Sequence, residues 1–406
     1  MSEFDIYQLE NLAEITSSKR IFYSDYVDAG VPFYRSKEII EIHNNKSVSN
    51  ELFISKEKFL EISNKFGAPE EGDILLTSVG TLGIPYLVRK GDNFYFKDGN
   101  LTWIRKINRT KVLPEYIYRF LRSPYGKSKL EEITIGSTQP ALTISGLKTL
   151  TLSIPSLMEQ QAIVSVLSSL DDKIDLLHRQ NKTLESMAET LFRQWFEVDS
   201  NDEWQEKNVL DIFTLVGGGT PKTSVAEYWT DEIPWISGGD ISAAHQGYLY
   251  STVKSISLAG IKYSSAKLLP KNTTVISARG TVGKYALLAK DMAFSQSNYG
   301  IVSKVGNYPF FIYLLVGFIV DDLLAAAYGS VFDTITTRTF ESVNLKFPSL
   351  NSMKIFNSEV SSIFNKKEKN TLQIQTLEKL RDILLPKLMS GEVRVKYAEE
   401  AIASVA

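Results

Sequence analysis

The chain has 406 residues, of which 43% are hydrophobic and 23% are charged, as in a globular protein long enough for two to four domains. This composition excludes a mostly disordered or collagen-like chain, and the lack of cysteine excludes disulfides, thiolate zinc sites and cysteine nucleophiles. The net charge of −2 and the pI of about 6.1 argue against a simple basic DNA-binding protein, because phosphate neutralisation normally needs a basic surface.

Two segments bear on where the protein works. The residues Met1–Asp5 lack a basic stretch followed by an apolar run, so they do not predict a signal peptide. The most apolar run, Phe310–Val320, is about half of the roughly 20 residues that span a bilayer, and we expect it to form a buried helix. These observations predict a cytoplasmic protein.

Residues 1–155 have the pattern of a globular domain, the first head. The segment Val31–Arg35 is followed by the apolar run Ile74–Leu76, which leads into the turn Gly80-Thr81-Leu82-Gly83. Short apolar runs bounded by glycine are typical of strands and turns. A mixed, β-rich domain is therefore expected.

Residues 156–198 predict a long helix. Apolar residues recur at alternating steps of four and three, which is the a/d pattern of a coiled coil with one polar member, Asn181. The positions are Ile163, Leu167, Leu170, Ile174, Leu177, Asn181, Leu184, Ala188, Leu191 and Trp195. Such a seam is too narrow to be buried inside a globular domain, so we expect it to pack on a second helix.

Residues 199–348 predict a second head. It opens with Gly217–Thr223, in which three glycines allow a tight turn and the close approach of another backbone. Thr220, Lys222 and Thr223 offer donors for phosphate oxygens, although a structural turn explains the same residues equally well.

Residues 349–395 predict the partner helix, and residues 396–406 a tail. The seam is Phe356, Val360, Ile363, Lys367, Asn370, Ile374, Leu377, Arg381, Leu384 and Leu388. It is polar at Lys367 and Asn370, where the first seam is apolar, and such an imperfect seam favours one partner and one register. We expect Pro386 and Gly391 to end this helix.

The two halves form an internal repeat. Pro114–Tyr118 matches Pro309–Tyr313, Gly136-Ser137 matches Gly329-Ser330, and similar matches continue in the same order along both helices. The predicted fold is therefore α+β: two β-rich mixed domains and two long helices that form an antiparallel coiled coil, with pseudo-two-fold symmetry.

Polar residues in the loops of the heads are candidates for DNA contacts. Arg279 and Lys284 flank the turn of the second head, where the first head has Val79 and Ile84, so the two heads would read different sequences. The amides of Gln296 and Asn298 can pair with adenine. For any single residue, an ordinary solvated loop explains the pattern as well. The full set of candidates is Arg35, Lys37, Ser78, Thr81, Lys97, Asn100, Ser137, Thr138, Gln139, Thr220, Lys222, Thr223, Arg279, Thr281, Lys284, Gln296, Asn298, Thr336 and Arg338.

Catalytic motifs are missing from the sequence. Gly280–Lys284 has two residues between its glycines and is followed by Tyr285, so it fails the phosphate-binding loop pattern. There is no Pro-Pro pair, and the single Asp-x-Lys, Asp171–Lys173, lies within the first heptad helix. The three histidines, His43, His178 and His245, have no ligand spacing. The sequence predicts neither an enzyme nor a metal site.

The order of these motifs resembles the specificity subunit of type I restriction–modification systems along nearly the whole chain. The most specific pieces are Gly218–Pro221, Tyr228-Trp229, Ile233–Ile236, Ser277–Gly283 and Leu384–Gly391. The first head matches less closely, because its start, Ile15–Arg20, lacks the Gly-Thr-Pro turn.

This resemblance implies that each head is a target-recognition domain for one half of a split sequence on double-stranded DNA. The paired helices would set the gap and dock two modification subunits, which carry S-adenosylmethionine and methylate adenine. Restriction subunits, with ATP and Mg, would join them, so this chain would bind no cofactor itself. Two alternatives fit the same residues: the recognition chain of a related phage-defence complex, and a coiled-coil adaptor whose heads bind sugar or protein.

Overall fold

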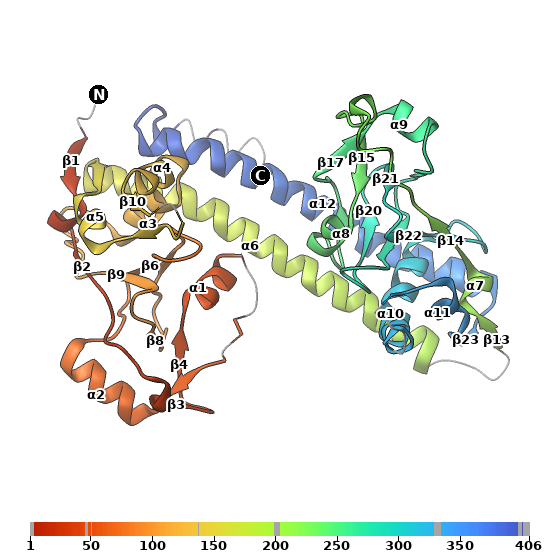
Figure 1. Cartoon of the computed structure of the whole chain (residues 1–406), viewed down its shortest axis with the longest axis horizontal. Coiled ribbons are helices and arrows are strands. Elements are labelled where there is room, and N and C mark those ends of the chain that lie inside the picture. The colour runs from red at the N-terminus through yellow and green to blue at the C-terminus, as the bar shows by residue number, and fades with distance from the viewer. Residues whose placement is uncertain are drawn as a thin grey trace. The chain divides into compact units, whose positions relative to one another are not determined.

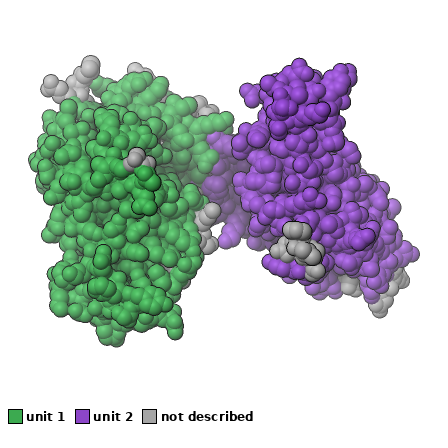
Figure 2. Space-filling model, in the orientation of Figure 1, with its two compact units in different colours: residues 1–174, 376–406 green, residues 175–375 purple. Residues whose placement is uncertain are grey.

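The computed structural model describes residues 4–44, 48–49, 51–136, 138–198, 204–328, 334–396 and 400. The chain divides into two compact units (Figure 2). The first unit contains residues 1–174 and 376–406, and the second contains residues 175–375. Each unit therefore holds one head together with a part of both long helices, whereas the sequence placed each helix in a segment of its own.

The first head is an alternation of short strands and short helices (Figure 1). Its elements are β1 (Asp5–Gln8), η1 (Leu9–Asn11), β2 (Glu14–Thr16), η2 (Tyr23–Asp25), β3 (Tyr26–Val27), β4 (Val31–Tyr34), α1 (Ser36–His43), β5 (Phe53–Ile54), α2 (Lys56–Phe66), β6 (Ile74–Thr77), β7 (Pro85–Leu87), β8 (Tyr95–Phe96), β9 (Leu101–Arg105), α3 (Pro114–Arg122), α4 (Pro124–Glu132), β10 (Thr134–Ile135), β11 (Ala141–Leu142), α5 (Ile144–Thr149) and β12 (Thr151–Ile154).

The second head repeats this order with local differences. Its elements are β13 (Gln205–Asn208), α7 (Val209–Ile212), β14 (Phe213–Gly217), η4 (Ala226–Tyr228), β15 (Ile233–Ile236), α8 (Gly238–Ala243), β16 (Tyr248–Leu249), β17 (Lys254–Ile256), α9 (Leu258–Lys262), β18 (Leu268–Leu269), β19 (Thr274–Ser277), β20 (Tyr285–Leu288), β21 (Met292–Phe294), β22 (Asn298–Ser303), α10 (Pro309–Ala327), α11 (Thr337–Glu341) and β23 (Asn344–Phe347).

The sheets confirm the internal repeat. The strand order β2-β9-β6-β7 in the first head corresponds to β14-β22-β19-β20 in the second, where β16 is added at the edge. The order β5-β4-β8 corresponds to β17-β15-β21, and in both heads the middle strand pairs parallel to the last. The small sheet β1-β12 corresponds to β13-β23, and each pair is antiparallel.

Two long helices complete the units: α6 (Leu157–Arg193), which continues as the π-helical turn η3 (Gln194–Val198), and α12 (Leu350–Met389). Most of the predicted seam is buried, including Ile163, Leu167, Leu170, Phe356 and Val360. Period-3.5 spacing places one stripe of side chains on one face of a helix, and that stripe is where α6 and α12 meet.

Polar seam residues of the second unit pair across the two helices. The Nδ2 of Asn181 donates to the Oγ1 of Thr371 at 3.1 Å, and the Lys367 ammonium contacts the Glu185 carboxylate. Asn181 pairs with Thr371, and the later residue Glu185 of α6 pairs with the earlier residue Lys367 of α12. The two helices therefore run antiparallel, as predicted. Polar pairs of this kind fix register, because any shift would leave buried groups without partners.

Of the two residues predicted to end α12, Gly391 does so and Pro386 does not. Pro386 lies inside the helix, which continues to Met389, and Gly391 follows with a φ of 75°. A proline in the last turn removes one N–H bond but does not prevent the turn, whereas the left-handed glycine ends the helix.

The apolar run Phe310–Val320 forms a buried helix, as expected, although the helix is longer than the run. Helix α10 has 19 residues and is long and apolar enough to cross a membrane by length and composition. Its buried side chains instead pack into the main core of the second unit, against residues such as Phe213, Ile276 and Phe356. In the first head the matching segment is divided into α3 and α4 by Ser123 and Pro124, where Ser123 caps the second helix.

Candidate nucleic-acid interface

Four loops of the second head meet at one edge through backbone hydrogen bonds. The N–H of Ala278 donates to the carbonyl of Ser297 at 2.9 Å, and the N–H of Ile335 donates to the carbonyl of Ala278 at 3.1 Å. The N–H of Ser295 donates to the carbonyl of Ile236 at 2.9 Å. These bonds bring together loops that carry most of the candidate residues of this head.

The first head uses the same three hydrogen bonds at matching positions. The N–H of Ser78 donates to the carbonyl of Asn100 at 2.9 Å, and the N–H of Leu142 donates to the carbonyl of Ser78 at 3.0 Å. The N–H of Lys97 donates to the carbonyl of Tyr34 at 2.9 Å. The loops around residues 34–36, 78–83, 97–100 and 138–142 therefore meet as their counterparts do. The repeat extends beyond the sheets to the loops, where the side chains differ.

The Gly-Gly-Thr-Pro turn packs into this edge. A Cβ on Gly218 would lie 2.4 Å from the carbonyl oxygen of Ser295, and the indole N–H of Trp235 donates to the carbonyl of Gly219 at 2.9 Å. The hydroxyl of Thr220 bonds the amide oxygen of Gln296, which joins two candidates 76 positions apart. The turn thus has a structural reason for its glycines, while Lys222 and Thr223 remain exposed.

Three candidates have side chains committed to the interior or to neighbouring loops. Asn298 is 1% exposed and its Nδ2 donates to Ser295 Oγ at 2.9 Å. Ser78 is buried and its hydroxyl pairs with that of Thr102 at 2.6 Å. Thr281 donates to the carbonyl of Gly238 at 3.0 Å. Their geometry fits roles in holding the loops together, and it argues against direct base contacts by Asn298 and Ser78.

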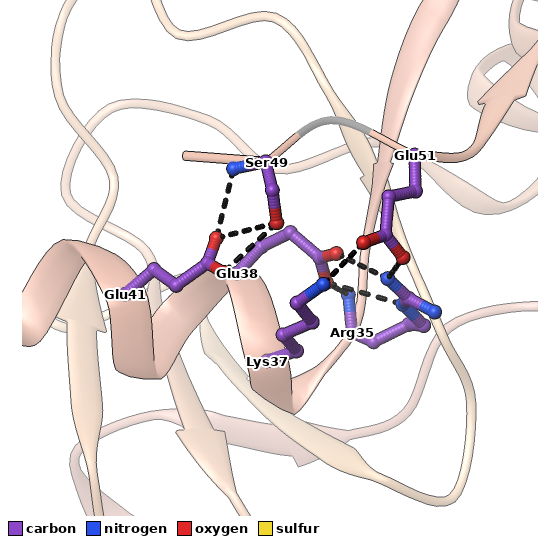
Figure 3. Close-up of polar contacts among 6 residues, drawn as sticks. All are labelled: Arg35, Lys37, Glu38, Glu41, Ser49 and Glu51. Atoms are coloured by element: carbon purple, nitrogen blue, oxygen red, sulfur yellow. Dashed lines mark hydrogen bonds and ion pairs between the residues drawn. The ribbon is translucent and has the colours of Figure 1, made fainter. Parts of the chain in front are cut away.

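Arg35 and Lys37, at the start of α1, lie within a network of carboxylates (Figure 3). The Nη2 of Arg35 lies 2.6 Å from Glu38 Oε1 and 2.9 Å from Glu51 Oε2, and Lys37 also pairs with Glu51. Glu38 is buried, whereas Glu51 is half exposed. Both cations therefore already have counter-ions, and a phosphate would have to compete with Glu51.

The remaining candidates keep accessible side chains, with one exception. Exposed on their loops are Thr81, Lys97, Thr138, Gln139, Arg279, Thr336 and Arg338, and Asn100 is half-buried. Lys284 instead lines a cavity beside His245. Ser137 lies outside the described residues.

The pairing of Glu38 and Glu51 with Arg35 was not predicted from the sequence. The spacing of Arg35 and Glu38 is that of a capping interaction, and the Glu38 carboxylate accepts from the Arg35 N–H at 2.7 Å, so this contact had a local signal. No local sequence signal pointed to Glu51, because the fold of the intervening loop brings it to Arg35 from 16 positions away. Within the described ranges, no group of three or more His, Asp or Glu side chains could hold a metal ion.

Comparison with known proteins decides the family. The model of the type I restriction modification DNA specificity domain matches residues 1–186 and again residues 201–382, once for each half of the repeat. This chain belongs to the type I restriction–modification DNA specificity family.

Relatives in this family resemble the chain along almost its whole length. It is 25% identical to the type I restriction enzyme HindI specificity subunit of Haemophilus influenzae, covering 97% of this chain and 100% of that protein. It is 26% identical to the MjaIX specificity subunit of Methanocaldococcus jannaschii, covering 97% and 94% respectively. The crystal structure of a type I S subunit from M. genitalium shares the fold, with a TM-score of 0.60, 15% identity and coverage of 95% of this chain and 96% of that one.

The specificity subunit is a DNA-recognition component and not an enzyme.

Proposed function

We propose that this specificity subunit reads a bipartite DNA target, one half with each head, and docks modification and restriction subunits on the paired helices. One observation carries the proposal: both heads hold the same loops with the same hydrogen bonds but present different side chains. Arg279 of the second head takes the place of Val79 in the first. One framework with two sets of side chains is what reading two different half-sites requires.

Base reading and phosphate contact would be divided among the exposed residues. Arg279, Arg338 and Lys97 supply charge for phosphate oxygens or guanine, and Gln139 and Gln296 supply amides for adenine. S-adenosylmethionine, ATP and Mg belong, in this proposal, to the partner subunits. The whole complex would act in the cytoplasm.

The experiment is a genome-wide map of N6-methyladenine in the host, with the gene intact, deleted, and carrying Arg279→Gln. We expect a split motif that loses methylation on deletion, and we expect the variant to change one half of that motif only. A methylation map that is unchanged on deletion, while the modification subunits are expressed, would contradict the proposal and favour the adaptor alternative.

A further inference from the structure

Two of the three histidines occupy matching positions in the repeat. His43 is the seventh residue after the first residue of α1, Ser36, and His245 is the seventh after the first residue of α8, Gly238. Each histidine lines a cavity within its own unit, of about 240 Å³ at His43 and about 340 Å³ at His245. The repeat therefore builds the same cavity twice.

The cavity of the first unit is strongly basic. It is lined by Arg119 and Arg122 from α3, Lys127 from α4 and Arg381 from α12. Asp382 is its lining carboxylate, and Asp171 lies behind the arginines. Four cations face two carboxylates, which leaves an excess of two positive charges in a confined space.

A single carboxylate is shared by three of these cations. Asp171 contacts Arg119, lies 3.0 Å from the Nη1 of Arg381 and 3.7 Å from the Nη1 of Arg122. In the part of the chain that the structure describes, Lys127 has no carboxylate partner and is exposed. Burial and the positive charges of Arg122, Lys127 and Arg381 hold the pKa of His43 below its ordinary value.

The cavity of the second unit has balanced charges. The match of Pro114–Tyr118 with Pro309–Tyr313 places Gly317 where the first unit has Arg122, and Asp322 where it has Lys127. Its charged lining residues are Arg193 and Lys284 against Glu189 and Asp321. The same backbone site therefore carries an excess of positive charge in one unit only.

We propose that the cavity lined by His43, Arg122, Lys127 and Arg381 is a binding site for a phosphate group. Guanidinium groups present parallel N–H donors that match phosphate oxygens, and two added negative charges would balance the excess of the lining. The ligand is inorganic phosphate, the phosphate of a free nucleotide, or a backbone phosphate of DNA. Its lining residues are distinct from the candidate base contacts, although Lys127 also lines a cavity with Leu82 and Gly83 of the loop edge.

The three histidines allow a direct test on the full chain. The protein is labelled with ¹³C at the histidine rings, which gives three signals; His178→Gln and His245→Gln assign two of them and leave the third to His43. Sodium phosphate is then titrated at constant pH against sodium chloride of equal ionic strength. We expect a saturable movement of the His43 signal with phosphate, while the His245 and His178 signals stay in place.

Variants separate binding from folding. Arg122→Gln and Lys127→Gln should each weaken phosphate binding by about tenfold, the usual effect of removing one charged hydrogen-bond donor. Lys284→Gln, in the matching cavity, should leave it unchanged. Lys127 is exposed, so its variant is expected to fold even if the Arg122 variant does not.

A second titration uses a DNA duplex in phosphate-free buffer. Movement of His43 with free phosphate identifies a small-molecule phosphate, and movement with the duplex alone identifies a backbone phosphate; either supports the proposal. No saturable movement with either ligand, or equal movement of all three histidine signals, overturns it. So does phosphate binding that Lys127→Gln leaves unchanged.

Discussion

Asp171 of α6 and Arg381 of α12 join the two long helices within the first unit, with 3.0 Å between Oδ1 and Nη1. The other carboxylate oxygen of Asp171 contacts Arg119 of α3. One side chain thus links both seam helices to the head. Burial alone would raise the pKa of Asp171, but Arg119, Arg122 and Arg381 outweigh it and hold the pKa below its ordinary value.

Asp171→Asn should therefore destabilise the first unit by about 3 kcal/mol near neutral pH, because it leaves the largely buried Arg119 without its counter-ion and Arg381 with Asp382 alone. Hydrogen–deuterium exchange of α3 peptides at increasing urea would measure the loss. Asp172→Asn is the matched control, since Asp172 is the exposed neighbour on the same helix. Equal protection in the two variants would contradict this reading.

The same contact predicts a pH dependence. A carboxyl whose pKa is lowered by folding stabilises the fold above its unfolded value, near 3.8, and this contribution disappears as the pH falls through the folded value. The stability difference between the wild type and Asp171→Asn should thus be largest near neutral pH and shrink in acid. Denaturation at several pH values measures it, and a difference that grows on acidification would exclude this account.

Glu51→Gln should strengthen DNA binding. The substitution removes the carboxylate shared by Arg35 and Lys37, which makes Lys37 available to phosphate while Arg35 stays paired with Glu38. In complex with the modification subunits, the affinity should rise several-fold and the salt dependence of binding should steepen by about one unit of slope. Glu57→Gln is the control, because Glu57 forms no ion pair within the described ranges. An unchanged salt dependence would show that Lys37 does not reach DNA.

Two adjacent glycines should differ sharply in their tolerance of alanine. A Cβ on Gly218 meets the carbonyl oxygen of Ser295 at 2.4 Å, whereas one on Gly217 meets no atom within 4 Å. Gly218→Ala should cost about 1–3 kcal/mol, because a backbone has to move, and Gly217→Ala should be close to neutral. Thermal unfolding of the two variants compares them directly. Similar losses would mean that the turn is not packed against the Gln296 loop.

Arg279→Gln should reduce DNA affinity of the complex by about tenfold, the usual scale for a lost charged contact. If Arg279 contacts a phosphate, all sequences lose affinity equally; if it reads guanine, one target position becomes relaxed. Binding to duplexes randomised at single positions separates these outcomes. Val79→Arg, the reciprocal change in the first head, should raise affinity, and no effect of either substitution would remove this loop from the interface.

The sequence predicted the features that depend on local spacing. Ile163, Leu167 and Leu170 are buried in the seam, because a heptad pattern is a property of neighbouring residues on one helix. The interior position of Asn298 could not be predicted, since alternation along a strand does not tell which face is covered. Glu51 reaches Arg35, and His43 reaches Arg381, only through the tertiary fold. Local spacing was enough to predict the helices and strands, whereas the partners of polar side chains could be known only from the tertiary structure.

The three backbone hydrogen bonds shared by the heads also bear on how such a protein can change over evolutionary time. Because main-chain groups hold the loops, residues such as Val79 and Arg279 contribute little to folding and can be exchanged without unfolding the head. Substitutions at these loop positions change the DNA sequence preference of the head more readily than its free energy of unfolding. A lineage can thus acquire new targets through a few neutral steps in one head, while the other head preserves half of the old specificity.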